Sequence, residues 1–147
     1  MSTGTDAALG GRVELSSLTA ALAGVDVLLL LTFVVVGEFS HFGVTALAFE
    51  RAPGTAAPFL LGWAVIAPLA GVYGTAARRS VRAAAVRTVA AWAGTVVVAQ
   101  SLRATAAFPG DFAVAFALVS LGVGLVLLLP WRVLVASRLA PAPEGTA

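Results

Sequence analysis

Three ionisable side chains lie within one apolar stretch, "GVDVLLLLTFVVVGEFSH", which covers residues 24–41. Asp26 stands near its beginning, and Glu38 and His41 close it at a spacing of three residues. On a helix this spacing places both side chains on one face, as in the Glu-x-x-His pairs of di-iron bundles. Such a site needs further carboxylates and a second histidine, whereas this chain has one histidine. Only a homodimer could complete it, so we expect no metal site and interpret His41 as a hydrogen-bonding residue at the membrane surface.

Asp26 is the costliest residue of this stretch if the segment crosses a bilayer. An aspartate at the centre of a membrane helix costs about 2.5 to 3.5 kcal/mol, whereas each Leu, Val or Phe gains roughly 0.3 to 0.6 kcal/mol. Residues 18–36 contain enough of these apolar residues to gain about 5 kcal/mol, so the segment inserts with a thin margin. At 100° per residue, Asp26 shares a stripe with Leu30, Gly37 and His41. We therefore expect Asp26 to face protein, either as a functional residue or as a packing contact between helices.

The sequence leaves more than one partner possible for these residues. Arg87 lies at a similar depth to Asp26 and could pair with it, or it could extend to the membrane surface and leave a neutral Asp26. At the other boundary we expect Glu38 to pair with Arg103, which would also draw residues 42–57 over the bundle as a cap. The alternative is that both side chains meet only water or lipid headgroups. The candidate functional polar residues are Asp26, Glu38, His41, Arg87, Gln100 and Arg103.

Several kinds of chemistry are excluded by what the chain lacks. It has no cysteine, so thiol catalysis, disulfides and cysteine-ligated metals are ruled out. All nine basic residues are arginine, so no lysine can form a Schiff base. Ser40 and His41 are adjacent and do not face each other on a helix, and no P-loop, dinucleotide-binding or zinc motif is present. We expect no enzyme activity, no catalytic residue, no cofactor and, because basic residues do not alternate with aromatic ones, no nucleic-acid partner.

The composition indicates a membrane protein. Of the 147 residues, 60% are hydrophobic and 11% are charged, and the mean hydropathy is +1.00. The apolar residues form four runs near the roughly 20 residues that cross a bilayer, and lipid cannot satisfy an exposed backbone. The chain is therefore predicted to be all-α, an integral membrane four-helix bundle, with the first run retained as a helix. The predicted spans are 18–36, 58–74, 83–102 and 112–131.

Arginine placement predicts the orientation. With the N-terminus in the cytoplasm, seven arginines lie on or near the inner side and two lie outside. The inner set is Arg12, Arg78, Arg79, Arg82, Arg87, Arg132 and Arg138, and the outer set is Arg51 and Arg103. We expect both termini to be cytoplasmic, a multi-pass protein of the cell membrane, and Trp131–Arg132 to anchor the last helix at the interface.

The segments between the runs suggest where helices begin and end. Pro53–Gly54 should end any extension of the first helix, and Pro68 should kink the second. Asp111, after the Pro109–Gly110 turn, should cap the last helix. We expect a cytoplasmic tail over 1–15, a four-span domain over 16–138 and a disordered cytoplasmic tail over 139–147.

Several longer motifs resemble one known family. They are "APFLLGWAVIAPLAGVYG", "TVAAWAG", "SLRATAAFPGDFAVAFALV" and the closing "WR". Over about residues 20–135 the chain is similar to the membrane-protein family called domain of unknown function 3054. The resemblance implies a small multi-span membrane protein and implies no activity, so no functional residue is carried over from it.

Two functions fit the sequence. The first is a small ion-coupled or solute transporter that acts as an oligomer, because four helices leave little room for a pathway. The second is a structural or accessory subunit of a larger membrane complex, without transport or catalysis of its own. The expected partners are the lipid bilayer and either further copies of the chain or other membrane proteins.

Overall fold

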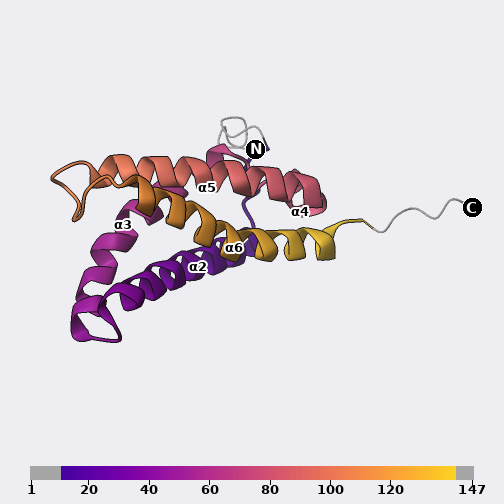
Figure 1. Ribbon diagram of the computed structural model, residues 1–147. Coiled ribbons are helices and arrows are strands. Elements are labelled where there is room, and N and C mark those ends of the chain that lie inside the picture. The colour runs from indigo at the N-terminus through magenta and orange to yellow at the C-terminus, as the bar shows by residue number, and fades with distance from the viewer. Residues whose placement is uncertain (1–10, 142–147) are drawn as a thin grey trace, which may run out of the picture.

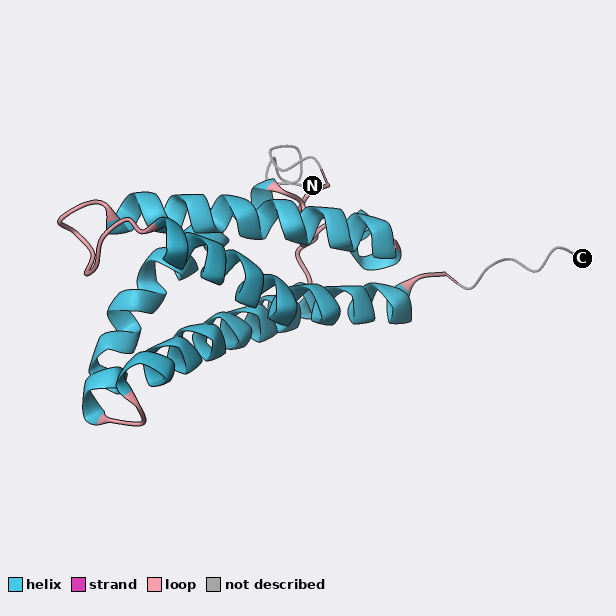
Figure 2. Ribbon diagram, viewed as in Figure 1, coloured by secondary structure: helices cyan, strands magenta, loops and turns pink. Residues whose placement is uncertain are grey.

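The computed structural model describes residues 11–141, and these residues form helices joined by short connections (Figures 1 and 2). The helices are α2 (Ser17–Phe42), α3 (Ala46–Leu69), the short α4 (Thr75–Arg79), α5 (Val81–Arg103) and α6 (Val114–Leu139). The four longer helices are each long and apolar enough to cross a membrane. The predicted all-helical, four-span fold is thereby confirmed, and the orientation of the termini stays a prediction.

Polar side chains define the starts of three spans. Ser16, Thr45 and Ser80 each accept a hydrogen bond from the backbone N–H three residues later, which supplies one of the donors left free at a helix start. Gly43 adopts a φ of 68° and ends α2, a conformation that glycine adopts without strain. The last helix departs from the prediction, because α6 begins after Ala113 without a side-chain cap and Asp111 lies outside it.

The prediction for Pro53–Gly54 is wrong, because α3 runs through both residues and the expected cap over 42–57 is mostly helix. Membrane helices tolerate proline where neighbouring groups hold the chain. Here the loop before α6 packs on this turn: a Cβ added to Gly54 would lie 2.7 Å from the Pro109 ring. Pro68 lies near the end of α3, which finishes at Leu69, so a kink in mid-helix does not arise there.

The helices form a bundle in which the spacing between α2 and α6 differs at the two ends (Figure 1). We call the end that holds residues 43–45 and 104–113 the loop end, and the end that holds the start of α2 and the end of α6 the termini end. α3 packs along α5 and α2, and α5 packs along α6. α2 and α6 meet toward the termini end and diverge toward the loop end, where α3 lies between α2 and α5 (Figure 1).

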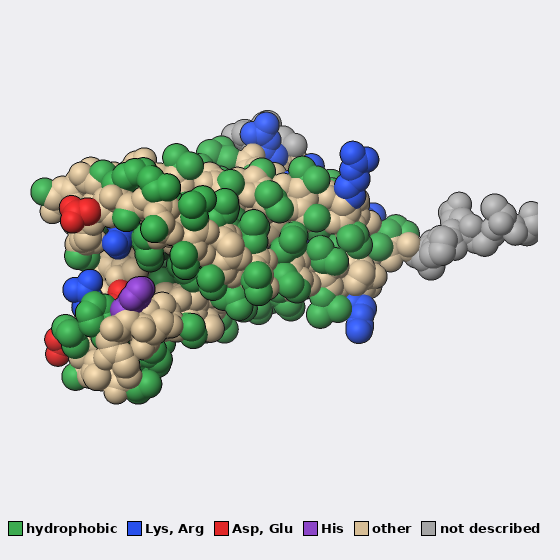
Figure 3. Space-filling model, in the orientation of Figure 1, with side chains coloured by type: hydrophobic (Ala, Val, Ile, Leu, Met, Phe, Trp, Pro, Cys, Tyr) green, Lys and Arg blue, Asp and Glu red, His purple; other side chains and the backbone are tan. Residues whose placement is uncertain are grey.

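An aromatic cluster fills the middle of the bundle. Phe59 stacks on Trp92 with ring centres 5.8 Å apart, and Phe33 meets both rings edge-on at 5.3 and 5.9 Å. Close backbone contact surrounds it, since a Cβ on Gly62 would lie 3.0 Å from the Thr95 carbonyl oxygen. Only 17 to 33% of each span's most apolar window is buried, so most of the apolar surface points outward, where lipid would lie. Charged side chains gather instead at the two ends (Figure 3).

Candidate functional site

Asp26 points into the bundle, as expected, and its side chain is 0% exposed. Its partner is Arg132 of α6, which is 4% exposed. Arg132 donates through Nε to Asp26 Oδ1 at 3.0 Å and through Nη2 to Oδ2, so the pair is bidentate. At 1.5 Å per residue, Asp26 lies roughly 14 Å from the start of α2 and Arg132 roughly 10 Å from the end of α6. Both charges therefore lie at hydrocarbon depth.

Two aromatic residues complete this ion-pair cluster, which we define as Asp26, Trp63, Tyr73 and Arg132. The Tyr73 hydroxyl donates to Asp26 Oδ2 at 2.7 Å and accepts from Trp63 Nε1 at 2.9 Å. The Arg132 guanidinium also lies over the Tyr73 ring, 4.9 Å from its centre. Burial, together with the neighbouring Asp26, raises the pKa of Tyr73 above its ordinary range. The hydroxyl thus stays protonated and available as a donor at physiological pH.

The N-terminal segment and α4 support this cluster from the termini end. Tyr73 belongs to the connection between α3 and α4, and its carbonyl accepts from the backbone N–H of Glu14 at 3.1 Å. Arg78 of α4 is buried beside it and pairs with the Glu14 carboxylate at 3.2 Å, with Thr19 as a further partner. These contacts fix Tyr73 although it lies outside the long helices.

Of the two alternatives for Arg87, the pair with Asp26 does not form. Arg87 Nη1 donates to the Gly71 carbonyl at 2.9 Å, where the chain leaves α3. Arg132 is likewise misplaced by the sequence prediction, because α6 continues to Leu139 and so puts Arg132 inside the span rather than at the interface. The apolar "VLV" that follows it, residues 133–135, is the signal that could have shown this.

The expected Glu38–Arg103 pair at the loop end is also wrong. Glu38 is 7% exposed and takes both of its partners from α3: Arg51 Nε at 3.3 Å and the Thr55 hydroxyl at 2.6 Å. Arg103 instead donates to the Pro109 carbonyl and lies over the Phe116 ring, 4.7 Å from its centre. The helices explain this outcome, because α2 and α5 make no close backbone contact in the described bundle.

The two remaining candidates differ in burial. His41 is exposed at the loop end. Gln100 is 2% exposed, and neither atom of its amide has a hydrogen-bond partner among the described residues. Within residues 11–141 no group of three or more metal-ligating side chains comes together.

A cleft opens between α2 and α6 at the loop end, where the surface in Figure 3 is hollowed beside charged side chains. Its volume is about 180 Å³, and its walls are mostly apolar. Two ionisable residues line the cleft, the carboxylate Glu38 and the imidazole His41. Phe33 lies on the cleft wall and also belongs to the aromatic cluster in the middle of the bundle. The cleft lies between α2 and α6 at the loop end, and the ion-pair cluster joins the same two helices deeper in the bundle.

Comparison with known proteins assigns the chain to a family by its sequence. Residues 23–135 match the family described as "Protein of unknown function (DUF3054)", which confirms the resemblance. The chain belongs to the DUF3054 family. No significant match was found among curated proteins or among solved structures. The matched region of this DUF3054 protein contains Asp26, Trp63, Tyr73 and Arg132, and thus the whole ion-pair cluster.

The Thr55 hydroxyl is expected to contribute measurably to the stability of the DUF3054 bundle. Thr55→Val should lower the free energy of unfolding by about 1 to 2 kcal/mol, because it leaves a buried carboxylate oxygen of Glu38 without this donor. Thr32→Val is the matched control, since the Thr32 hydroxyl is exposed and bonds only the Leu28 carbonyl of its own helix. Reversible unfolding in mixed micelles measures both. Equal losses in the two variants would contradict the importance of the Thr55 contact.

Proposed function

We propose that this protein is a small solute transporter that works as an oligomer. The observation that carries the proposal is an open cleft at the loop end of one helix pair, with a buried ion pair deeper between the same two helices. α2 and α6 are joined by the buried ion-pair cluster toward the termini end and are separated by the cleft at the loop end. A space open toward one side and closed by a charged contact toward the other is what alternating access requires. Ionisable residues at hydrocarbon depth are also functional candidates by default.

In this proposal the cleft receives the solute and the ion-pair cluster is the closure on the far side. A cleft of about 180 Å³ with one carboxylate admits only a small molecule. One chain offers four spans, so further copies would complete the pathway. Opening would require α2 and α6 to separate at Asp26 and Arg132, a hinge motion of one helix pair.

Cysteine accessibility tests this closure without knowledge of the solute. Leu30 lies one turn from Asp26 toward the cleft and is 1% exposed. In proteoliposomes, Leu30→Cys should react with a membrane-impermeant thiol reagent slowly from both sides of the membrane. Tyr73→Phe removes one hydrogen bond to Asp26 but keeps the ion pair, so it should raise labelling from the termini side about fivefold to tenfold.

Two positions serve as controls for this experiment. Gly37→Cys lies in the cleft wall with free space around its Cβ and should react quickly from the loop side alone. Leu28 is 63% exposed on the apolar outer surface of α2, where lipid would surround it. Leu28→Cys should therefore react from neither side. If Leu30→Cys stays unreactive in both backgrounds while Gly37→Cys reacts, the closure does not open and transport is excluded.

An accessory role in a larger membrane complex is the second candidate. Its support is that both carboxylate oxygens of Asp26 are already bonded within the chain, so the cluster needs no solute to be satisfied. A static cluster of this kind can fix helix packing alone. The unreactive outcome above would favour this second function.

We also propose that the termini end faces the cytoplasm of a cell membrane. Because Arg132 lies inside the α6 span, it no longer counts among the arginines of the loops. The arginine asymmetry is then six to two instead of seven to two. Reporter fusions at residues 1 and 147 should both give cytoplasmic signals. An external signal from either fusion would overturn this orientation.

A further inference from the structure

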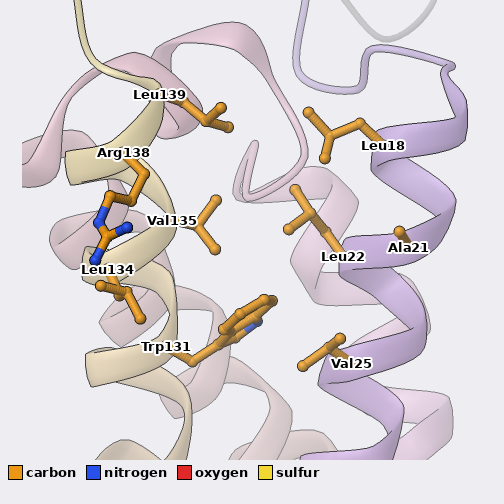
Figure 4. A pocket seen from close by; sticks show the side chains of 9 residues that line it. All are labelled: Leu18, Ala21, Leu22, Val25, Trp131, Leu134, Val135, Arg138 and Leu139. Atoms are coloured by element: carbon orange, nitrogen blue, oxygen red, sulfur yellow. The ribbon is translucent and has the colours of Figure 1, made fainter.

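A second hollow of the molecule lies at the termini end, again between α2 and α6 (Figure 4). Its volume is about 390 Å³, and apolar side chains of both helices form its walls, among them Leu22, Val25 and Val135. The Trp131 indole closes its deep end, and Leu18 and Leu139 face each other at its mouth (Figure 4). We call this space the groove. It is open along its length toward the surroundings of the bundle, unlike the packed aromatic core.

The walls of the groove are mostly apolar, and its deep end is the Trp131 indole. An occupant that fills its length must itself be apolar along that length, as an acyl chain is.

The mouth of the groove continues into a polar pocket of about 250 Å³. The two spaces share Leu18 and Leu139, and the polar pocket is otherwise lined by Glu14, Thr75, Arg78 and Arg79. Arg78 is occupied by Glu14, but the exposed Arg79 makes no ion pair within residues 11–141, and neither does Arg138 at the rim of the groove. The groove thus has the Arg138 guanidinium on its rim, and the adjoining polar pocket has that of Arg79. Each can pair with a phosphate.

The length of the groove matches one half of a bilayer. From Trp131 to Leu139 the helix rises roughly 12 Å, and one leaflet of hydrocarbon is about 15 Å thick. A helix of a second copy, at about 10 Å across, is wider than a space of about 390 Å³ over that length accommodates. A single acyl chain is narrow enough for this volume and long enough for this length.

We infer that the groove binds an anionic glycerophospholipid of the leaflet at the termini end. One acyl chain lies along the groove, with its inner part against the Trp131 indole at the deep end. The phosphate lies between Arg79 and Arg138. This binding site is independent of the proposed transport function, since it uses neither the cleft nor the ion-pair cluster.

Quenching of Trp131 by brominated lipid tests the inference. The protein is reconstituted in phosphatidylcholine vesicles that contain a small fraction of phosphatidylglycerol, and one of the two lipids carries bromine on its acyl chains. The part of the emission that is absent in Trp131→Phe reports on the groove. Brominated phosphatidylglycerol should quench this part about tenfold more effectively than brominated phosphatidylcholine at equal mole fraction.

The two arginines should account for the preference. Arg79→Gln and Arg138→Gln should each weaken the relative binding constant for phosphatidylglycerol about fivefold. Arg82→Gln is the matched control, because it removes the same charge from the same end without lining either space, and it should leave the preference unchanged.

A blocked groove gives an independent readout. Ala21 is an exposed member of the groove wall, so Ala21→Phe should abolish the excess quenching without disturbing the core. Leu28→Phe, on the outer surface of α2, should not. Equal quenching by the two lipids would overturn the inference in favour of ordinary bilayer contact. No quenching by either lipid, together with crosslinking of Ala21→Cys between two chains, would overturn it in favour of a second copy.

Discussion

Arg132→Gln is expected to lower the free energy of unfolding by about 3 to 5 kcal/mol, because it removes one partner of a buried ion pair. The substitution leaves the Asp26 carboxylate 0% exposed and without its bidentate partner. The remaining donor, the Tyr73 hydroxyl, satisfies only one of the two oxygens. Reversible unfolding in mixed micelles measures the loss.

Two further variants separate the loss of the pair from the loss of a positive charge. Asp26→Leu combined with Arg132→Met removes both charges together, so the free energy of unfolding should return to within about 1 kcal/mol of the native value. Arg138→Gln removes an exposed charge of the same helix and should change it by less than about 0.5 kcal/mol. If Arg132→Gln were as mild as Arg138→Gln, the buried pair would contribute no stability.

Gly124→Ala is expected to cost about 3 kcal/mol, more than helix propensity would suggest, because alanine is normally the better helix former. A Cβ at this position would overlap the indole of Trp92. That ring cannot move away easily: it is 0% exposed, and its Nε1 donates to the Ser120 carbonyl at 3.0 Å and the Leu121 carbonyl at 3.2 Å. The substitution should therefore separate α5 from α6.

Gly122 provides the control on the same helix. No atom lies within 4 Å of a Cβ built there, and the residue is exposed. Gly122→Ala should be neutral or should stabilise the protein by up to about 1 kcal/mol. Opposite signs for two alanine substitutions two residues apart would identify Trp92 packing as the cause. A similar effect at both positions would contradict it.

The number of spans could be predicted from the sequence because lipid imposes a length and an apolar composition on each of them. The ends of the helices could not, and α3 shows why. Its first two turns contain Glu50, Arg51 and Pro53, which read as a loop by composition. They are helical because Arg51 and Thr55 bind Glu38 of the neighbouring helix and because Pro109 packs on Gly54. Those contacts depend on tertiary structure that local composition does not encode.

For the candidate site, the burial of Asp26 could be predicted from the sequence, but its partners could not. The cost of Asp26 in hydrocarbon made its burial predictable, since a single residue's solvation free energy decides it. The partner required knowledge of depth on two helices at once. An error of two turns at the end of α6 moved Arg132 from the core to the interface and left Arg87 as the one partner considered. Tyr73 gave no signal in the sequence, because its position depends on backbone contacts with Glu14.

The separation of Asp26 and Arg132 along the chain has a consequence for biosynthesis. The two residues are 106 positions apart, so the carboxylate emerges from the ribosome with the first span and its partner with the last. At 5 to 20 residues per second, Asp26 waits roughly 5 to 20 s for Arg132. A chain whose synthesis stops before α6 carries an uncompensated acid in its first span. Only the completed polypeptide therefore neutralises Asp26 within the membrane, and a truncated product keeps an unpaired carboxylate there.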